Sequence, residues 1–165
     1  ATLFLEEALD REPQNVDVLT RCGTMLKLRG DVSGSSAMYH RALAIHPSHV
    51  TATCDLADLE HECMGNTGAA SDLYRQALLL HPDSPTLHSR YANILQSVGE
   101  TEGAVRHYGD SIALDPSGAG SQHQLSALLR LQGREDAALG LAGRAVSLDP
   151  TNADAAVEHA RGLMA

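Results

Sequence analysis

Apolar and polar side chains alternate along this chain with the spacing of α-helices. In residues 35–43, for example, Ser35, Tyr39, Ala42 and Leu43 occupy positions i, i+4, i+7 and i+8. These four side chains lie on one face of a helix. The same arrangement of small and large residues recurs along the chain, which predicts an all-α protein built from amphipathic helices.

Prolines mark the interval at which the pattern repeats. Pro13, Pro47, Pro82, Pro116 and Pro150 are separated by 34, 35, 34 and 34 residues. An internal repeat of this length is typical of solenoids in which each unit is a pair of helices. We therefore expect a repeat architecture over the whole chain.

Small side chains occupy three fixed positions in every unit when the marked proline is counted as position 32. These positions hold Gly23, Ala57, Ala92, Ser126 and Ala160 (position 8), Ala1, Ser35, Ala70, Ala104 and Ala138 (position 20), and Ala8, Ala42, Ala77, Ser111 and Ala145 (position 27). Large residues occupy positions 24 and 28, as in Tyr39 with Leu43. Small residues at such sites let two antiparallel helices approach closely.

Turn and cap residues mark the ends of the expected helices. Position 15 is glycine, which suits the left-handed backbone that ends a helix; these residues are Gly30, Gly65, Gly99 and Gly133. The expected helix starts carry N-cap residues, namely Asn15, Asn152 and Ser84, which precedes Pro85. Each unit is therefore predicted to be a first helix, a glycine turn, a second helix and a proline turn.

A 34-residue period with small residues at positions 8, 20 and 27, an aromatic at 24 and proline at 32 resembles the tetratricopeptide repeat (TPR). The resemblance implies a right-handed α-solenoid of antiparallel helix pairs. It makes residues 1–165 a single solenoid with a lone second helix at 1–13, repeats at 16–49, 50–84, 85–118 and 119–152, and a lone first helix at 153–165.

The chain departs from the family pattern in three places. The family's aromatic at position 4 is missing, and its second-helix aromatic is replaced by Ala142 in the fourth repeat. The repeat at 50–84 has one extra residue between Asp58 and Gly65, which we expect to form a bulge in the first helix. A rival array, the pentatricopeptide repeat, reads RNA, but its period is 35 residues and RNA binding requires positive charge.

Composition narrows the class of partner. The 165 residues include 21 acidic and 12 basic side chains, a net charge of −9. This balance argues against nucleic-acid binding, which depends on clustered Lys and Arg. No apolar run approaches the roughly 18 to 20 residues that span a membrane, so no membrane partner is expected. Three cysteines do not make a disulfide framework, which favours an intracellular location, most simply the cytoplasm.

The resemblance places function in the concave groove lined by the first helices, where TPR proteins hold a peptide or helical segment of another protein. The candidate groove residues are Arg21, Thr24, Lys27, Asp55, Asp58, Glu62, Arg90, Asn93, Gln124 and Arg130. Only Arg90 matches the carboxylate clamp that some family members use, so binding of acidic chaperone tails is not expected. Asn93 and Gln124 fit part of the asparagine ladder found in the arms of protein O-glycosyltransferases.

Three acidic residues in this set point to a basic partner. Asp55, Asp58 and Glu62 lie at i, i+3 and i+7, which places them on one helix face provided that the extra residue does not rotate Glu62 away. One interpretation is an acidic patch that binds a segment carrying Lys or Arg. The other is a solvated polar face in an acidic protein.

The sequence contains no nucleophile elbow, phosphate loop or dinucleotide fingerprint. Cys54, His61 and Cys63 form a Cys/His cluster, but their spacing matches no zinc motif. We therefore expect no catalytic, cofactor or metal site, and the chain is not expected to be an enzyme.

The predicted function is a protein–protein interaction scaffold or adaptor. The alternative is a substrate-docking arm of a larger enzyme, such as a protein O-glycosyltransferase, whose catalytic domain lies outside this chain. The lone helices at 1–13 and 153–165 interrupt the repeat, so further chain upstream is expected. Self-association through these terminal helices is a further expectation.

Overall fold

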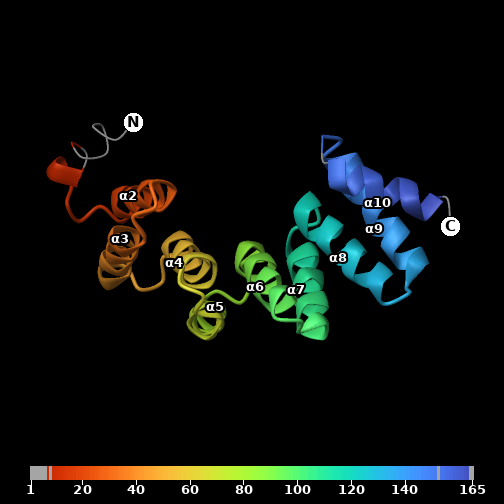
Figure 1. The fold of residues 1–165 in the computed structure, drawn as a ribbon, viewed down its shortest axis with the longest axis horizontal. Helices are drawn as coiled ribbons and strands as arrows, with labels where there is room; N and C mark the ends of the chain where they lie inside the picture. The colour runs from red at the N-terminus through yellow and green to blue at the C-terminus, as the bar shows by residue number, and fades with distance from the viewer. Residues whose placement is uncertain (1–6, 8, 152, 164–165) are drawn as a thin grey trace. The chain divides into compact units, whose positions relative to one another are not determined.

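A computed structural model describes residues 7, 9–151 and 153–163, which form helices joined by short turns and contain no strand (Figure 1). The predicted all-α class is confirmed. The first helices are α2 (Val16–Leu28), α4 (Val50–Glu62), α6 (Pro85–Ser97) and α8 (Ala119–Leu131). The second helices are α3 (Val32–Ile45), α5 (Thr67–Leu80), α7 (Thr101–Leu114) and α9 (Glu135–Leu148), and α10 (Ala153–Leu163) follows. The first helices begin where the four predicted repeats begin.

The chain divides into two compact units, 1–82 and 83–165. In the first unit, α2 packs on α3, α3 on α4 and α4 on α5. In the second unit, the helices from α6 to α10 pack in the same way, each on the next along the chain. The lone second helix predicted at 1–13 lies largely outside the described residues, although Glu7 and residues 9–11 are helical.

The predicted caps are present where the structure describes them. The Asn15 side chain accepts hydrogen bonds from two backbone amides at the start of α2, and the Ser84 side chain accepts one from Leu87, with Pro85 in the first turn of α6. The third predicted cap, Asn152, lies outside the described residues. These bonds satisfy amides that a helix N-terminus otherwise leaves without acceptors.

Glycine ends the first helices in the left-handed conformation that the sequence predicts. The φ angles are +81° at Gly30, +67° at Gly65, +83° at Gly99 and +74° at Gly133. After α2, the Gly30 amide donates to the Lys27 carbonyl at 2.9 Å and the Asp31 amide donates to the Leu26 carbonyl at 2.9 Å. This pair of bonds is the Schellman motif, which satisfies carbonyl groups at the helix end.

The bulge expected in the 50–84 repeat is absent, and that prediction is wrong. Helix α4 is a regular α-helix from Val50 to Glu62, and the extra residue lies in the turn that follows. Three residues, 63–65, separate the end of α4 from Asn66, the N-cap of α5. Only two residues separate the end of α2 from Asp31, the N-cap of α3. An exposed turn absorbs an added residue without breaking the hydrogen-bond ladder of the helix.

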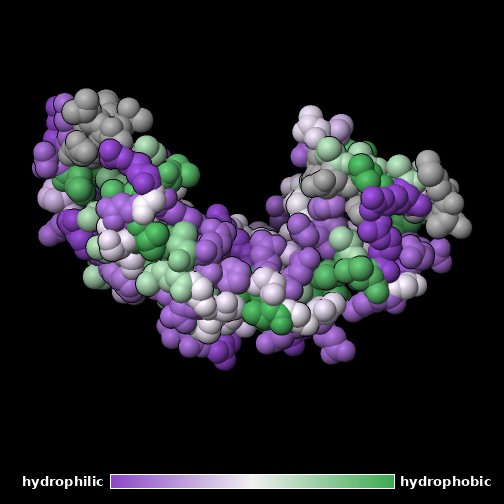
Figure 2. Space-filling view, in the orientation of Figure 1, coloured by the Kyte–Doolittle hydropathy of each residue, from purple (hydrophilic) through white to green (hydrophobic). Residues whose placement is uncertain are grey.

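The core consists of the small and large positions predicted from the repeat. Tyr39, Tyr74 and Tyr108 are at most 1% exposed, and the small residues of α2 to α9 at positions 8, 20 and 27 are buried. Close packing is clearest at Gly23, where an added Cβ would lie 2.6 Å from Cε1 of Tyr39. Of the described residues at these positions, only Ala160 of α10 is exposed. In the view of Figure 2, hydrophilic side chains cover much of each unit and hydrophobic ones form separate patches.

Candidate functional site

In the first unit, the structure brings together five predicted residues on α2 and α4. The Lys27 Nζ atom lies 2.7 Å from Glu62 Oε2, and the Thr24 hydroxyl donates to Asp55 Oδ2 at 3.3 Å. Glu62 therefore stays on the face that the sequence predicts, because the extra residue follows it rather than precedes it. We call Asp55, Asp58 and Glu62 the acidic patch.

The ion pair at the edge of the acidic patch is held in place. The Lys27 side chain is 26% exposed and the Glu62 side chain 57%. Burial disfavours the charged ammonium, but the hydrogen bond and the charge of Glu62 outweigh this effect, so that the pKa of Lys27 is raised. The pair links the C-terminal ends of α2 and α4.

In α3, α5 and α7, a tyrosine at position 24 forms a hydrogen bond with the polar residue at position 9 of the first helix in the same repeat. The three bonds join Tyr39 to Thr24 at 3.2 Å, Tyr74 to Asp58 at 2.5 Å, and Tyr108 to Asn93 at 2.5 Å. Three predicted groove residues therefore also hold the helix pair together. We call these contacts the tyrosine bonds.

The fourth repeat has lost both partners of the tyrosine bond. Its position 24 is Ala142, which is buried, and its position 9 is Ala127. The sequence carried this signal, since a tyrosine at position 24 occurs only with a polar residue at position 9. Comparing positions across repeats would have predicted the bond, but reading each position separately did not.

In the second unit, α6 and α8 line a polar pocket of about 440 Å³. It contains the two predicted amide residues, and we call it the amide pocket. Its lining residues are Ser89, Asn93, Tyr108, Gly118, Gly120, Ser121, His123 and Gln124. The His123 Nδ1 atom is buried without a hydrogen-bond partner among the described residues. Such an atom leaves hydrogen-bonding capacity unused.

The remaining predicted residues lie outside these two groups. Arg21 is exposed on α2, whereas Arg90 on α6 and Arg130 on α8 are half-buried. At the ends of first helices, Leu28 and Leu131 are 76% and 79% exposed. The two leucines occupy the same repeat position. At this position, each of the two compact units presents an exposed leucine that follows a basic residue in the sequence.

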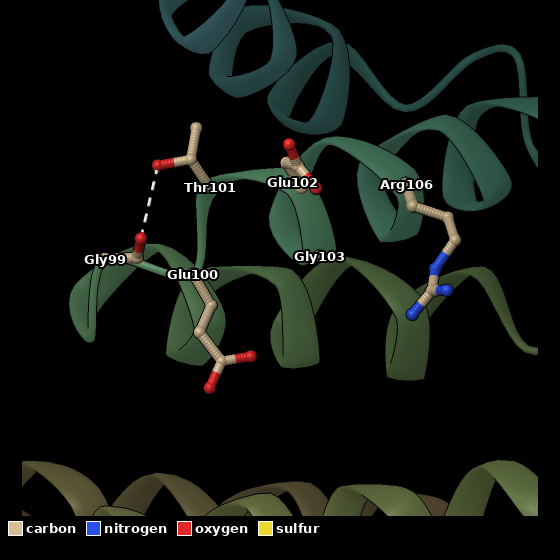
Figure 3. Close-up of a pocket in the computed structure, with 6 residues that line it drawn as sticks. All are labelled: Gly99, Glu100, Thr101, Glu102, Gly103 and Arg106. Atoms are coloured by element: carbon tan, nitrogen blue, oxygen red, sulfur yellow. Dashed lines mark hydrogen bonds between the residues drawn. The ribbon is translucent and has the colours of Figure 1, made fainter.

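A second pocket in the second unit contains none of the predicted residues. It measures about 710 Å³ and lies at the start of α7, lined by Gly99, Glu100, Thr101, Glu102, Gly103 and Arg106. Figure 3 shows Glu100 and Arg106 extending to the same side, with Glu102 pointing away from them. The Thr101 hydroxyl donates to the Gly99 carbonyl at 3.4 Å, which closes the turn.

Sequence reasoning missed a cluster of His88, His107 and Asp110 between α6 and α7. Their potential ligand atoms all lie within 4.8 Å of one another. Burial, followed by the nearby His88 and Arg106, lowers the pKa of His107, with a smaller opposing effect of Asp110. The repeat register held a weak signal, because His88 fills position 4, where the tetratricopeptide pattern has an aromatic.

The helices that the structure describes include none with both the length and the apolar character of a membrane span.

No family model matches the sequence, and no curated protein matches it significantly. Solved structures are similar in fold. TTC0263, a TPR protein of Thermus thermophilus, is 20% identical with a TM-score of 0.80, over 98% of this chain and 88% of that one. YrrB, described as a TPR protein with an unusual peptide-binding site, is 18% identical with a TM-score of 0.70, over 97% and 82%. Yeast Tom70 is 19% identical with a TM-score of 0.86, over 98% of this chain and 35% of Tom70.

Proposed function

Because this chain has the TPR fold, we propose that it is a protein-interaction module that holds a segment of a partner protein against its first helices. The observation that carries the proposal is the amide pocket, where side chains of α6 and α8 line one cavity. Asn93 and Gln124, which the sequence analysis singled out, lie in its wall. The peptide-binding site named for YrrB is consistent with this class of ligand.

The chemistry of the amide pocket suits a peptide backbone. Each residue of an extended peptide presents one N–H donor and one carbonyl acceptor. Gln124 offers both kinds of group through its amide, and Ser89 and Ser121 offer hydroxyls that donate or accept.

The acidic patch supports a basic segment in the partner. Hydrogen bonds from Thr24 and Tyr74 fix the positions of the Asp55 and Asp58 carboxylates, and a carboxylate can accept several further bonds. The net charge of −9 favours encounter with a cationic segment. We therefore propose a partner segment that carries Lys or Arg toward the first unit.

The scaffold interpretation is preferred over the docking-arm alternative because of how Asn93 is used. An asparagine ladder grips the substrate backbone through both ends of each amide. Asn93 Oδ1 instead accepts the Tyr108 phenol at 2.5 Å, so this amide is already committed to the helix pair on one side. Gln124 alone does not make a ladder.

A bulky side chain at Gly120 tests the amide pocket without disturbing the fold. Gly120 lines the pocket, and a Cβ added there meets no atom within 4 Å. Gly140 of α9 is a matched control, because it is also exposed and helical with no atom within 4 Å of an added Cβ. Peptides selected from a random display library against the wild-type chain would be measured against Gly120→Trp and Gly140→Trp.

We expect Gly120→Trp to weaken binding at least tenfold and Gly140→Trp to leave it unchanged. Circular dichroism would confirm that both variants keep their helical content. Peptides that bind Gly120→Trp as tightly as the wild type would place the site elsewhere. Failure of the library to yield any specific peptide would count against the proposed function itself.

The charge of the partner needs a separate test. The double variant Asp55→Asn with Asp58→Asn removes two charges, while each amide oxygen can still accept the bond from Thr24 or Tyr74. Asp10→Asn with Asp72→Asn removes the same charge from residues outside the acidic patch. We expect only the first pair to weaken binding of selected basic peptides and to reduce its salt dependence. If the two double variants weakened binding equally, the effect would come from the net charge of the chain and not from the acidic patch.

A further inference from the structure

Two histidines and an aspartate converge on one point between α6 and α7. His107 and Asp110 are three residues apart on α7, so they share a helix face, and His88 faces them from α6. The His88 and His107 Nδ1 atoms lie 2.9 Å apart, and Asp110 Oδ2 lies 3.8 Å from His88 Nδ1. No other group of three His, Cys, Asp or Glu side chains comes this close among the described residues.

The short distance between two imidazole nitrogens restricts their protonation. A neutral imidazole has one N–H donor and one lone pair, so two Nδ1 atoms at 2.9 Å must share a proton or be bridged by a cation. The arrangement therefore presents nitrogen lone pairs and a carboxylate to the same small space.

The distances suit a tetrahedral metal ion. With Zn–N bonds of about 2.05 Å, ligand atoms in a tetrahedral site lie about 3.3 Å apart. Two of the three separations, 2.9 Å and 3.8 Å, lie on either side of that value, and all the potential ligand atoms lie within 4.8 Å of one another. Two imidazoles with one carboxylate match the preference of zinc and its first-row neighbours.

Neighbouring rings pack against His107, and the Asp110 side of the cluster is open to solvent. The His107 ring contacts two rings of α6, those of His88 at a centroid distance of 5.2 Å and Tyr91 at 4.9 Å. The His88 side chain is 12% exposed and the Asp110 side chain 50%. An ion can therefore enter from the Asp110 side, where water can supply a fourth ligand.

We propose that His88, His107 and Asp110 form a binding site for a divalent transition metal ion of the zinc class, with three protein ligands and one water. The proposal is independent of peptide binding, because none of the three residues lines the amide pocket or belongs to the acidic patch. Bound metal would cross-link the two helices of the third repeat. It would thereby stabilise the second unit by an amount that rises with the logarithm of the free metal concentration once that concentration exceeds Kd.

Isothermal titration of the chelator-treated chain with Zn²⁺ tests the site, with Mg²⁺ as the comparison ion. We expect one Zn²⁺ per chain, no measurable Mg²⁺ binding at the same concentration, and a rise in Tm with Zn²⁺. Asp110→Asn should weaken Zn²⁺ binding at least tenfold, and His107→Gln should abolish it. His46→Gln is the control for binding by surface histidines, since His46 is exposed and lies in the other unit.

Replacement of Zn²⁺ by Co²⁺ adds a readout that reports geometry. A tetrahedral site with two imidazole ligands gives visible Co²⁺ absorption, which Asp110→Asn should alter and His46→Gln should not. Zn²⁺ binding that is unchanged in Asp110→Asn and His107→Gln would overturn the proposal, whatever the stability of the variants. So would the absence of one-to-one binding to the wild-type chain, which would leave a proton shared between the two histidines as the explanation of their contact.

Discussion

Removal of the Tyr108 hydroxyl tests whether the tyrosine bonds stabilise the helix pairs. The side chain is 1% exposed, and its hydroxyl donates to Asn93 Oδ1 at 2.5 Å and lies 2.9 Å from Gln96 Oε1. Tyr108→Phe keeps the ring and its packing but leaves these oxygens without their donor. We expect a loss of about 1–2 kcal/mol in the free energy of unfolding at pH 8.

The pH dependence of this loss gives a sharper test. Burial raises the pKa of Tyr108 from 10.0 to about 12. Between these values the unfolded chain gives up the phenolic proton and the folded chain keeps it, so rising pH favours unfolding. For this pKa shift, ionisation of Tyr108 lowers the free energy of unfolding of the wild type by about 1.4 kcal/mol by pH 11. Tyr108→Phe lacks the phenol and loses nothing from this group. The advantage of the wild type should therefore shrink to near zero at about pH 11.

Urea unfolding followed by circular dichroism would measure both chains at pH 8, 10 and 11. The other tyrosines titrate in both proteins, so their contributions cancel in the difference. If the urea midpoint of unfolding at pH 8 were the same in Tyr108→Phe and the wild type, the hydroxyl would contribute nothing to stability. A difference that stays constant from pH 8 to pH 11 would show that the phenol is not protected from ionisation, which would refute the reasoning from burial.

Three further substitutions test the packing, the turns and the surface charge. Gly23→Ala should destabilise the first unit by about 1–3 kcal/mol, because its Cβ would lie 2.6 Å from the Tyr39 ring; thermal unfolding with an unchanged Tm would contradict this. Gly99→Ala should cost about 1 kcal/mol in urea unfolding, because φ is +83° there. Glu62→Gln should lower stability by less than about 1 kcal/mol, since its ion pair with Lys27 is partly exposed. That effect should disappear in 1 M salt, and an effect that persists would indicate a role other than charge.

The helices and their turns could be predicted from the sequence because each depends on local residue types at a fixed spacing. A glycine such as Gly30 ends a helix wherever it falls in the register, and small residues identify helix contacts without knowledge of the fold. The extra residue in the second repeat lies within the predicted range, but the expected bulge was wrong because spacing alone does not distinguish a helix bulge from a longer turn. The turn accommodates it because its backbone is exposed.

The candidate sites could be predicted only in part, because side-chain contacts depend on two helices at once. Asn93 and Gln124 were selected from their register on the first helices, and they do line one pocket. The cluster around His107 was missed because its ligands come from both helices of a pair and match no linear motif. Only the register of one helix against the other places His88 opposite them.

The tyrosine bonds also determine how binding at the first helices can be studied. Position 9 serves two purposes, since Asp58 and Asn93 accept bonds from buried tyrosines and also belong to the predicted groove. An alanine at either position would remove the shorter of the two hydrogen bonds that each buried phenol makes, so that weaker binding would be indistinguishable from a looser helix pair. Substitutions that keep an acceptor, such as Asp58→Asn, or that add bulk at an open position, such as Gly120→Trp, avoid this ambiguity. The fourth repeat, where Ala127 and Ala142 have replaced both partners, shows that the repeat fold forms without the bond, so a change at position 9 that lowers stability by about 1 kcal/mol need not unfold the chain.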